Sequence, residues 1–360
     1  MKYPKFLPEK GAIGFVAPSF GCNIEPYRSA FNNAQKKLKE LGHTLDLGPN
    51  CYEGCGIGIS NTPEACGKEL TEYYCSTSND VLISFGGVEL MCERMEHVDF
   101  ETIKAAEPKW YMGYSDNTNM TFLLTTLCDT AAIYGPCAGA FGMEPWHESI
   151  QDAYDLLRGK SLTVSGYDRW EKESLKDEEQ PLLPYNVTEE RNIHIFLPAE
   201  SQGHEGAMIE FLGKEVPETL VQVEGRLVGG CMDCLVNILG TRFDGVAEFN
   251  ERYKEDGIIW FIESCDLNVM AIRRAIWQMK NAGWFSYVKG FLIGRPLCFG
   301  QNIMGLDQYH AVIDLLQEYN VPIFMDLDIG HLAPMMPIVS GAYAKVSVKG
   351  NDVTISYELK

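Results

Sequence analysis

The sequence lacks an apolar run long enough to cross a membrane, and it has few basic residues. Lysine and arginine number 30 against 50 aspartates and glutamates, which gives a formal net charge of −20. Binding to a nucleic-acid polymer needs a clustered basic face, so this balance argues against such a partner. The stretch MKYPKFLPEKGAIGFVAPS has prolines and charges where a signal peptide needs an unbroken apolar core. We therefore expect a cytoplasmic protein with no membrane partner.

Metal-binding motifs are also scarce. The seven histidines form no H-E-x-x-H or H-x-H grouping. The C-x-x-C of Cys231 and Cys234 lies in the helical pattern GGCMDCLVNILG, and no second pair stands at zinc-finger spacing. We interpret this pair as core residues, and we predict no metal and no cofactor.

Cysteine itself is abundant, with twelve residues in the chain. They are scattered through apolar segments such as TTLCDTAAIYGPC and RPLCFG, where a reduced cysteine behaves as a small hydrophobic residue. We therefore predict free thiols in a reducing compartment.

The 360 residues are enough for two domains of ordinary size. Residues 1–150 alternate short apolar strands with helical stretches, which predicts a doubly wound, flavodoxin- or Rossmann-like parallel sheet in an α/β domain. Ligands of such sheets bind beyond the carboxyl ends of the strands. Residues 151–205 are rich in charge, proline and isolated aromatics, and we interpret them as a connection. Residues 206–360 predict a smaller, strand-rich α/β domain.

The individual elements follow from apolar runs and their boundaries. In the first domain the pattern predicts strands near 11–19, 43–49, 80–87, 110–115 and 131–137, and helices over 27–42, 63–76 and 144–159. In the second it predicts strands near 256–264, 288–296 and 321–330, and helices over 229–240, 267–283 and 306–320. The chain ends in a predicted hairpin turned at Gly350 and Asn351.

The most informative segment is KWYMGYSDNTNMTFLLTTL, which predicts a strand, a tight turn and an amphipathic helix. Ser115 lies at the turn, where a nucleophilic serine is usually built because the first N–H groups of the helix can hold an oxyanion. The residues read GYSDN, without the second glycine of the G-x-S-x-G motif. Ser115 also has the chemistry of an ordinary N-cap that accepts from the N–H of Asn117 or Thr118, and caps are far commoner than nucleophiles. The segment alone leaves both interpretations open.

A serine nucleophile needs a base, and the base needs an acidic partner. Glu263 directly follows the apolar run GIIWFI at a predicted strand end, where it also suits a helix amino terminus. His331 follows MDLDIG in a turn just past another strand. Serine, acid and histidine in this order is the order of the α/β-hydrolases.

Eight short motifs, together and in this order, resemble the LD-carboxypeptidases of serine peptidase family S66. That family includes the muramoyltetrapeptide carboxypeptidases of peptidoglycan recycling and the microcin C immunity peptidases. The motifs span nearly the whole chain: GAIGFVAPS at 11–19, SFGG at 84–87, GYSDNT at 113–118, YGP at 134–136, EGRLVGGCMDCLVNILGT at 224–241, WFIES at 260–264, IGRP at 293–296 and DIGHLAPMMPI at 328–338.

The resemblance implies a Ser115–Glu263–His331 triad and an oxyanion hole formed by the backbone N–H groups of Gly87 and Asp116. It implies a serine carboxypeptidase that cleaves an amide bond next to a free carboxylate, in a peptidoglycan-derived tetrapeptide. It also implies a homodimer.

Two departures leave the substrate open. SFGGVELM has no arginine before its glycines and no tyrosine after them, unlike the R-G-G-Y-G type loop of the tetrapeptide enzymes. The long connection, with Trp146, Trp170 and Tyr185, is more like the microcin-immunity branch, whose substrates are aminoacyl- or peptidyl-nucleotides. Its aromatics either stack a base or cover a hydrophobic edge. A non-catalytic ligand-binding protein is a third alternative.

Overall fold

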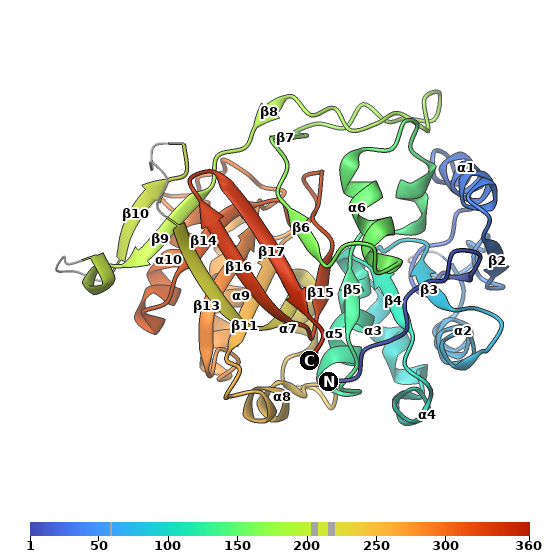
Figure 1. Cartoon of the computed structure of the whole chain (residues 1–360), viewed down its shortest axis with the longest axis horizontal. Coiled ribbons are helices and arrows are strands. Elements are labelled where there is room, and N and C mark those ends of the chain that lie inside the picture. The colour runs from blue at the N-terminus through green and yellow to red at the C-terminus, as the bar shows by residue number, and fades with distance from the viewer. Residues whose placement is uncertain (58–59, 203–207, 215–219) are drawn as a thin grey trace. The chain divides into compact units, whose positions relative to one another are not determined.

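The structure, a computed structural model, describes residues 1–57, 60–202, 208–214 and 220–360 (Figure 1). The described chain forms two compact units. The first unit comprises Met1–Leu162, Glu173–Asn186 and Met336–Gly341, and the second comprises Thr163–Lys172, Val187–Met335 and Ala342–Lys360. The first unit thus takes in part of the connection and a short segment of the region 206–360.

The first unit contains a six-stranded sheet in the order β2-β1-β3-β4-β5-β15. Strands β1 to β5 pair in parallel and β15 is antiparallel to β5, so the predicted doubly wound sheet is confirmed (Figure 1). The strands are β1 (Ala12–Val16), β2 (Thr44–Leu47), β3 (Val81–Ser84), β4 (Trp110–Gly113), β5 (Ala132–Tyr134) and β15 (Ile338–Ser340). Strand order reverses between β1 and β3, and ligands of open α/β sheets bind at such a point.

Strand β15 was not expected from the sequence. It has only three residues, all buried, and so shows no alternation that would mark a strand. Its Ser340 hydroxyl shares a hydrogen bond of 3.0 Å with the Thr125 hydroxyl. This pairing is therefore set by tertiary contacts.

The helices of the first unit begin and end at recognisable signals. Thr62 caps α2 by accepting from the Ala65 N–H at 3.3 Å, and Pro63 occupies the first turn, where its missing N–H costs nothing. The α-helices are α1 (Tyr27–Glu40), α2 (Pro63–Cys75), α3 (Met91–Arg94), α4 (Phe100–Ala105), α5 (Thr118–Thr126) and α6 (Glu148–Leu157). Short 3-10 helices are η1 (Met95–His97), η2 (Ser115–Asn117) and η3 (Ala138–Gly142).

Helix α5 corrects one prediction, because it is buried along its whole length rather than amphipathic. Its threonines make the sequence look half polar. In the structure the hydroxyls of Thr121, Thr125 and Thr126 donate to carbonyl oxygens one turn earlier, at 2.9 to 3.3 Å. A hydroxyl satisfied in this way can be buried without an unpaired polar atom.

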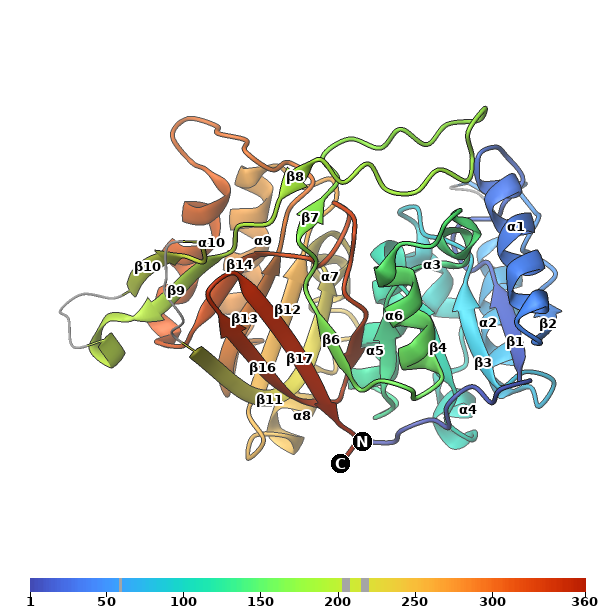
Figure 2. The same ribbon diagram turned by 45° about the horizontal axis from the view of Figure 1, so that its top comes forward.

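The second unit contains a nine-stranded mixed sheet in the order β10-β9-β14-β13-β12-β11-β16-β17-β6. The four central strands, β14 to β11, are parallel to one another, and the outer strands pair antiparallel (Figure 2). The bounds are β6 (Thr163–Ser165), β9 (His194–Pro198), β10 (Met208–Leu212), β11 (Leu220–Cys231), β12 (Ile258–Glu263), β13 (Val288–Gly294), β14 (Ile323–Leu327), β16 (Tyr343–Lys349) and β17 (Asp352–Glu358). The predicted strand-rich α/β region is confirmed, including its terminal hairpin.

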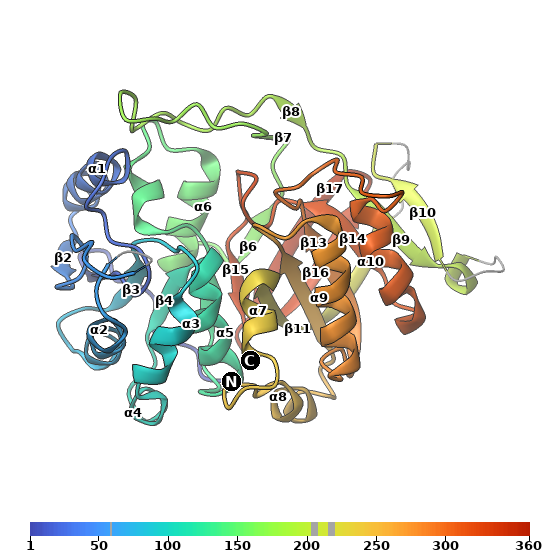
Figure 3. The ribbon, with the colours of Figure 1, turned by 180° about the vertical axis from the view of Figure 1, so that it is seen from behind.

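Helices α7, α9 and α10 lie on one face of this sheet (Figure 3). The helices are α7 (Met232–Ile238), α8 (Val246–Arg252), α9 (Val269–Asn281) and α10 (Gln308–Leu316), with η4 (Ala199–Gln202) and η5 (Gln317–Tyr319). A separate two-stranded ribbon joins β7 (Arg169–Trp170) to β8 (Glu189–Glu190). Within the described residues no helix is long and apolar enough to cross a membrane. All twelve cysteines are free thiols, as predicted.

A buried carboxyl supports the loops that follow β1 and β2. Glu69 of α2 accepts from the N–H groups of Ala17 and Asn50, each at 2.9 Å. Burial raises the pKa of Glu69 to about 7, although both backbone hydrogen bonds act to lower it. The folded protein therefore holds the Glu69 proton at pH values where the unfolded chain has released it.

We expect this carboxyl to make stability depend on pH. Because the folded pKa lies above the unfolded value of 4.5, its contribution is full below pH 4.5 and is lost as pH rises through 7. A shift of this size corresponds to about 3 kcal/mol. The free energy of unfolding of Glu69→Gln, measured by urea denaturation, should therefore rise relative to that of wild type when the pH is raised from 5 to 8. Glu72→Gln, exposed on the same helix, should show no such trend. If the difference in free energy of unfolding between Glu69→Gln and wild type were the same at pH 5 and pH 8, Glu69 would not have the raised pKa.

Candidate active site

Ser115 lies in a strained turn at the carboxyl end of β4. Tyr114 is extended, and Ser115 then begins η2 with φ +63°. This left-handed backbone conformation is unfavourable for a residue with a side chain, and strain of this kind is typical of a nucleophile turn. The N–H of Ser115 donates to the Tyr134 hydroxyl at 3.1 Å. The adjacent strand β5 thus helps to hold the turn.

Ser115 does not occupy the N-cap position that the sequence left open for it, since Tyr114 caps η2 and Asn117 caps α5. The Asn117 N–H donates to the Tyr114 carbonyl oxygen at 3.2 Å, and the Thr118 N–H donates to the carbonyl oxygens of Ser115 and Asp116. Both N–H groups that a serine cap would serve therefore have backbone acceptors. The cap position of η2 belongs to Tyr114.

The two predicted oxyanion residues, Gly87 and Asp116, lie against each other. They follow β3 and β4, which are neighbours in the sheet. A Cβ atom on Gly87 would stand 2.9 Å from the Asp116 Cβ and 3.0 Å from its backbone nitrogen. Only glycine allows so close a backbone approach.

The side chain of Asp116 ties these two loops together, a role that sequence reasoning missed. Its buried carboxylate accepts from the Ser19 hydroxyl at 2.5 Å, the Met91 N–H at 3.0 Å and the Asn119 amide at 3.0 Å. The Ser19 hydroxyl in turn accepts from the Val88 N–H at 2.9 Å. Burial raises the pKa of Asp116, and the hydrogen bond from Ser19 opposes that shift.

Asn117 adds a second link between the same loops. Its amide nitrogen donates to the Gly86 carbonyl oxygen at 3.1 Å, and its amide oxygen accepts from the Tyr111 hydroxyl at 2.6 Å. Both side chains of the Asp-Asn pair that follows Ser115 thus position backbone, which explains why these polar residues are buried.

In the second unit the structure brings Glu263 and His331 together. Glu263 is the last residue of β12, and His331 lies four residues beyond the end of β14. The Nδ1 atom of His331 stands 2.8 Å from Oε2 of Glu263, whose side chain is fully buried. A carboxylate on Nδ1 fixes the orientation of the ring and leaves Nε2 as the nitrogen that does not face Glu263.

Two glycines make this pair possible, since β13 runs between β12 and β14. A Cβ atom on Gly294, at the end of β13, would stand 2.0 Å from the Ile329 carbonyl oxygen and 3.0 Å from the Cβ of Glu263. Gly330 has φ +105°, and a Cβ there would stand 2.5 Å from Oε2 of Glu263. The histidine turn can cross the end of β13 only because both residues lack a side chain.

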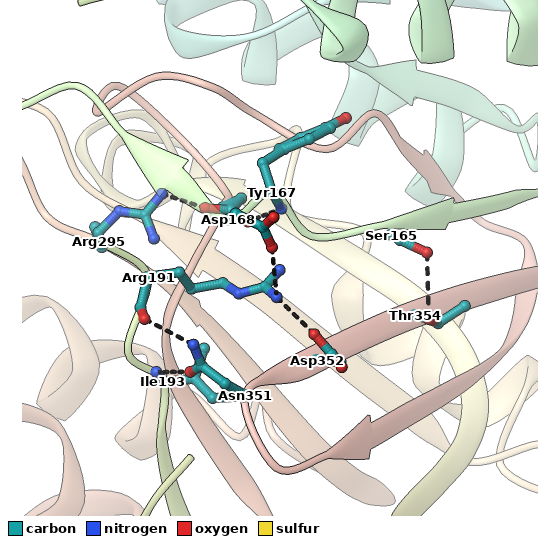
Figure 4. A network of polar contacts seen from close by, with 10 residues as sticks. Ser165, Tyr167, Asp168, Arg191, Ile193, Arg295, Asn351, Asp352 and Thr354 are labelled. Atoms are coloured by element: carbon teal, nitrogen blue, oxygen red, sulfur yellow. Dashed lines mark hydrogen bonds and ion pairs between the residues drawn. The ribbon is translucent and has the colours of Figure 1, made fainter. Parts of the chain in front are cut away.

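A buried ion pair anchors the start of the histidine turn. Asp328 pairs with Arg295, and both side chains are almost completely buried. Arg295 also donates to the Asp326 carbonyl oxygen at 2.8 Å, and Asp328 accepts from the Tyr167 N–H at 2.7 Å. Figure 4 shows Arg295 and Tyr167 in this network, with the Arg191–Asp352 pair beside them.

The electrostatic surroundings of His331 are dominated by burial and by Glu263. Burial disfavours the imidazolium, but the Glu263 carboxylate and a hydrogen bond with Cys265 outweigh it. Together they raise the pKa of His331 well above its ordinary value of 6.5. The site therefore stabilises the charged histidine that forms when a base takes up a proton.

The connection aromatics contact protein groups within their own units. Trp170 lies 5.0 Å from the Phe299 ring and 5.0 Å from the Arg295 guanidinium. In the first unit Trp146 packs 5.7 Å from Tyr154, and Tyr185 lies 5.4 Å from His147. These contacts favour the interpretation that the aromatics cover a hydrophobic edge rather than stack a base, most clearly for the buried Trp170.

A doubly wound sheet with a strained serine turn, together with a buried Glu-His pair, has the features of a serine hydrolase. Comparison with known families makes the class more specific. The family model of the LD-carboxypeptidase N-terminal domain matches residues 13–135, and that of the C-terminal domain matches residues 224–346. The two matches cover more than half of the chain, which therefore belongs to the LD-carboxypeptidase family S66.

Individual relatives are distant in sequence but match most of the chain. A Vibrio cholerae protein named as a carboxypeptidase is 24% identical over 93% of this chain and 92% of its own. A Bacillus subtilis protein named as a murein peptide carboxypeptidase is 24% identical over 96% of this chain and 91% of its own.

The microcin C7 self-immunity protein MccF of Escherichia coli is 22% identical over 82% of this chain and 79% of its own. Its solved structure with aspartyl sulfamoyl adenosine has a TM-score of 0.78 at 19% identity, covering 99% of both chains. At this identity the structural likeness shows the fold.

The Gly294 contact gives a test of how the Glu263–His331 pair is built. Gly294→Ala places a methyl group against the Ile329 carbonyl oxygen, which is backbone and cannot turn aside. We expect a loss of about 1–3 kcal/mol in the free energy of unfolding, as for other overpacked sites. The His331 imidazole proton bonded to Glu263, followed by NMR, should also lose its protection from exchange.

Gly290→Ala is the matched control on the same strand, because its nearest neighbours would stand at 3.4 Å. It should leave both measurements close to those of wild type. Equal effects of the two substitutions would show that the close approach at Gly294 does not determine the pair.

Proposed function

We propose that this protein is a cytoplasmic serine carboxypeptidase acting through a Ser115–Glu263–His331 triad. The observation that carries the proposal is the buried hydrogen bond of 2.8 Å between Glu263 and His331, at two strand ends of the second unit. Family membership and the strained turn at Ser115 support the assignment of the nucleophile. The family resemblance also suggests a homodimer, which sedimentation analysis would test.

The chemistry follows from the hydrogen-bonding state of His331. With Nδ1–H donated to Glu263, Nε2 carries the lone pair that accepts the Ser115 hydroxyl proton. Ser115 Oγ attacks the scissile carbonyl carbon, and His331 passes the proton to the leaving amine. Water then attacks the acyl-enzyme with His331 again as base, which releases the shortened peptide and regenerates Ser115.

The negative charge of the tetrahedral intermediate falls on the former carbonyl oxygen. In the proposal the backbone N–H groups of Gly87 and Asp116 bind it. Their close packing, fixed by the Asp116 carboxylate and by Asn117, supports a preorganised pair of donors. Each such donor is worth about 3–4 kcal/mol of transition-state stabilisation.

The substrate we propose is a peptidoglycan-derived tetrapeptide, cleaved at an L,D amide bond next to its free carboxylate. The family match and the Bacillus subtilis relative named for murein peptides support this substrate. An aminoacyl- or peptidyl-nucleotide is the alternative, and the likeness to MccF in sequence and fold favours it. The packing of Trp170 against Arg295 and Phe299 counts against that ring as a base-stacking platform.

The triad predicts that Ser115→Ala, Glu263→Ala and His331→Ala each abolish most hydrolysis. A loss on the order of 10⁴-fold in kcat is expected for each, and the double variants should lose little more because the three residues act as a unit. Single-turnover and steady-state assays of the folded variants measure this. If His331→Ala retained full activity, the base would have to be another residue.

The substrate class is tested by assaying wild type and Ser115→Ala on two compounds in parallel. One is an L,D-tetrapeptide muropeptide, and the other is an aminoacyl sulfamoyl adenosine. We expect wild type alone to release D-alanine from the muropeptide. Turnover of only the nucleoside conjugate would establish the immunity-type activity, and turnover of neither would favour a non-catalytic binding protein.

The raised pKa of His331 predicts the acid limb of the pH–rate profile. Neutral His331 is the base, so kcat/KM should fall as pH drops through a value above 6.5. In Glu263→Gln the carboxylate no longer supports the imidazolium while burial still opposes it, so the limb should move to lower pH and the maximum rate should fall. An acid limb at the same pH in both proteins would assign that ionisation to another group.

A further inference from the structure

Cys231 lies beside the Glu263–His331 pair. It is the last residue of β11, and its register partner on the adjacent parallel strand β12 is Glu263. Residues paired in this way point to the same face of a sheet. The sulfur of Cys231, a carboxylate oxygen of Glu263 and a ring nitrogen of His331 all lie within 4.8 Å of one another.

Thiolate, imidazole and carboxylate are together the donor set of protein zinc sites. Zinc bond lengths of about 2.0–2.3 Å place the ligand atoms of a tetrahedral site about 3.3–3.7 Å apart. The three atoms here lie within 4.8 Å of one another, so their longest separation would have to shorten by about 1.5 Å at most to reach that spacing. Cys231 and Glu263 are each 1% exposed, whereas the His331 side chain retains 12% exposure and gives an ion a way in.

Further groups surround the three ligands. Cys234 hydrogen-bonds to Cys231 within the C-x-x-C, and Cys265 hydrogen-bonds to His331. The Asp233 carboxylate accepts from the Cys231 thiol at 3.3 Å and from the N–H of Cys265 at 3.0 Å. Carboxylates that orient metal ligands in this way strengthen metal binding.

We propose that Cys231, Glu263 and His331 form a binding site for a thiophilic divalent cation of the Zn²⁺ class, and that its occupation inhibits the hydrolase. Binding releases the Cys231 thiol proton to solvent and forms a sulfur–metal bond. The sequence suggested only core packing for this C-x-x-C, because Glu263 and His331 are distant from it along the chain. The binding part of the inference stands on these residues alone, and the inhibition rests on the proposed function.

The ion would inhibit the hydrolase whether it binds Nδ1 or Nε2 of His331. An ion on Nδ1 replaces the hydrogen bond to Glu263 and moves the ring proton to Nε2, where no lone pair remains to accept a proton from serine. An ion on Nε2 occupies that lone pair directly. In both cases His331 can no longer act as a base. The effect is reversible, since a chelator removes the ion and restores the hydrogen bond.

The test begins with cobalt, because Co²⁺ substitutes for Zn²⁺ and reports thiolate ligation by a charge-transfer band. Reduced, metal-free full-length protein is titrated with Co²⁺, and Zn²⁺ affinity is then measured by competition with a chromogenic chelator. We expect wild type to bind one ion with the thiolate band. Cys231→Ser should lose the band and bind Zn²⁺ at least tenfold more weakly.

Matched controls separate this site from the other thiols. Cys128→Ser removes a buried thiol and Cys55→Ser an exposed one, and both should bind as wild type does. Glu263→Gln, a second variant of similar shape, should also weaken Zn²⁺ binding. Circular dichroism and thermal melts confirm that each variant is folded. An unchanged band and affinity in Cys231→Ser would overturn the site and leave only adventitious binding to other thiols.

Inhibition is measured separately on whichever substrate the enzyme turns over. Zn²⁺ should inhibit wild type and Cys128→Ser, and the chelator should restore their activity. Cys231→Ser, compared with its own metal-free rate, should be at least tenfold less sensitive to Zn²⁺. If neither substrate is hydrolysed, the binding result still decides whether the site exists. If the ion binds through Cys231 without inhibiting an active enzyme, the regulatory part of the inference is wrong.

Discussion

The buried hydrogen bond between Glu263 and His331 is the constraint on which the turns after β12 and β14 depend. A fully buried carboxylate is tolerable only with a partner, and removing one member of such a pair costs about 3–5 kcal/mol. The partner here, His331, lies in a turn beyond another strand. The strand order, the two glycines and the Arg295–Asp328 ion pair are therefore all needed to place this turn against Glu263. The raised pKa of His331 is a consequence of the same arrangement.

In the first unit, buried polar side chains in loops hold the backbone around Ser115 in position. Asp116 and Asn117 hydrogen-bond to the backbone of the loop that follows β3, and Gly87 lacks a side chain where that loop touches Asp116. Strain is concentrated at Ser115, and the hydrogen bonds around it hold the turn in place. Under the proposed function, this rigid support would preorganise the nucleophile and its N–H donors.

Several features were predictable because they depend on local pattern. The parallel strands of both units, the helices between them and the hairpin at Gly350 follow from apolar periodicity and turn residues. Strand β15 was not predictable, since three buried residues carry no period. The burial of α5 was hidden for a different reason, because threonine hydroxyls that bond within the helix make a core element look polar.

The sequence by itself determined the fold class, the family and the identities of Ser115, Glu263 and His331 as candidates, because each follows an apolar strand in a recognisable order. Only the tertiary structure decided that Glu263 contacts His331 and that Cys231 lies beside both. The physical reason is that these contacts join strand ends far apart in the chain. Their meeting depends on strand order and on the absence of a side chain at Gly294, and neither appears in the local pattern of residues.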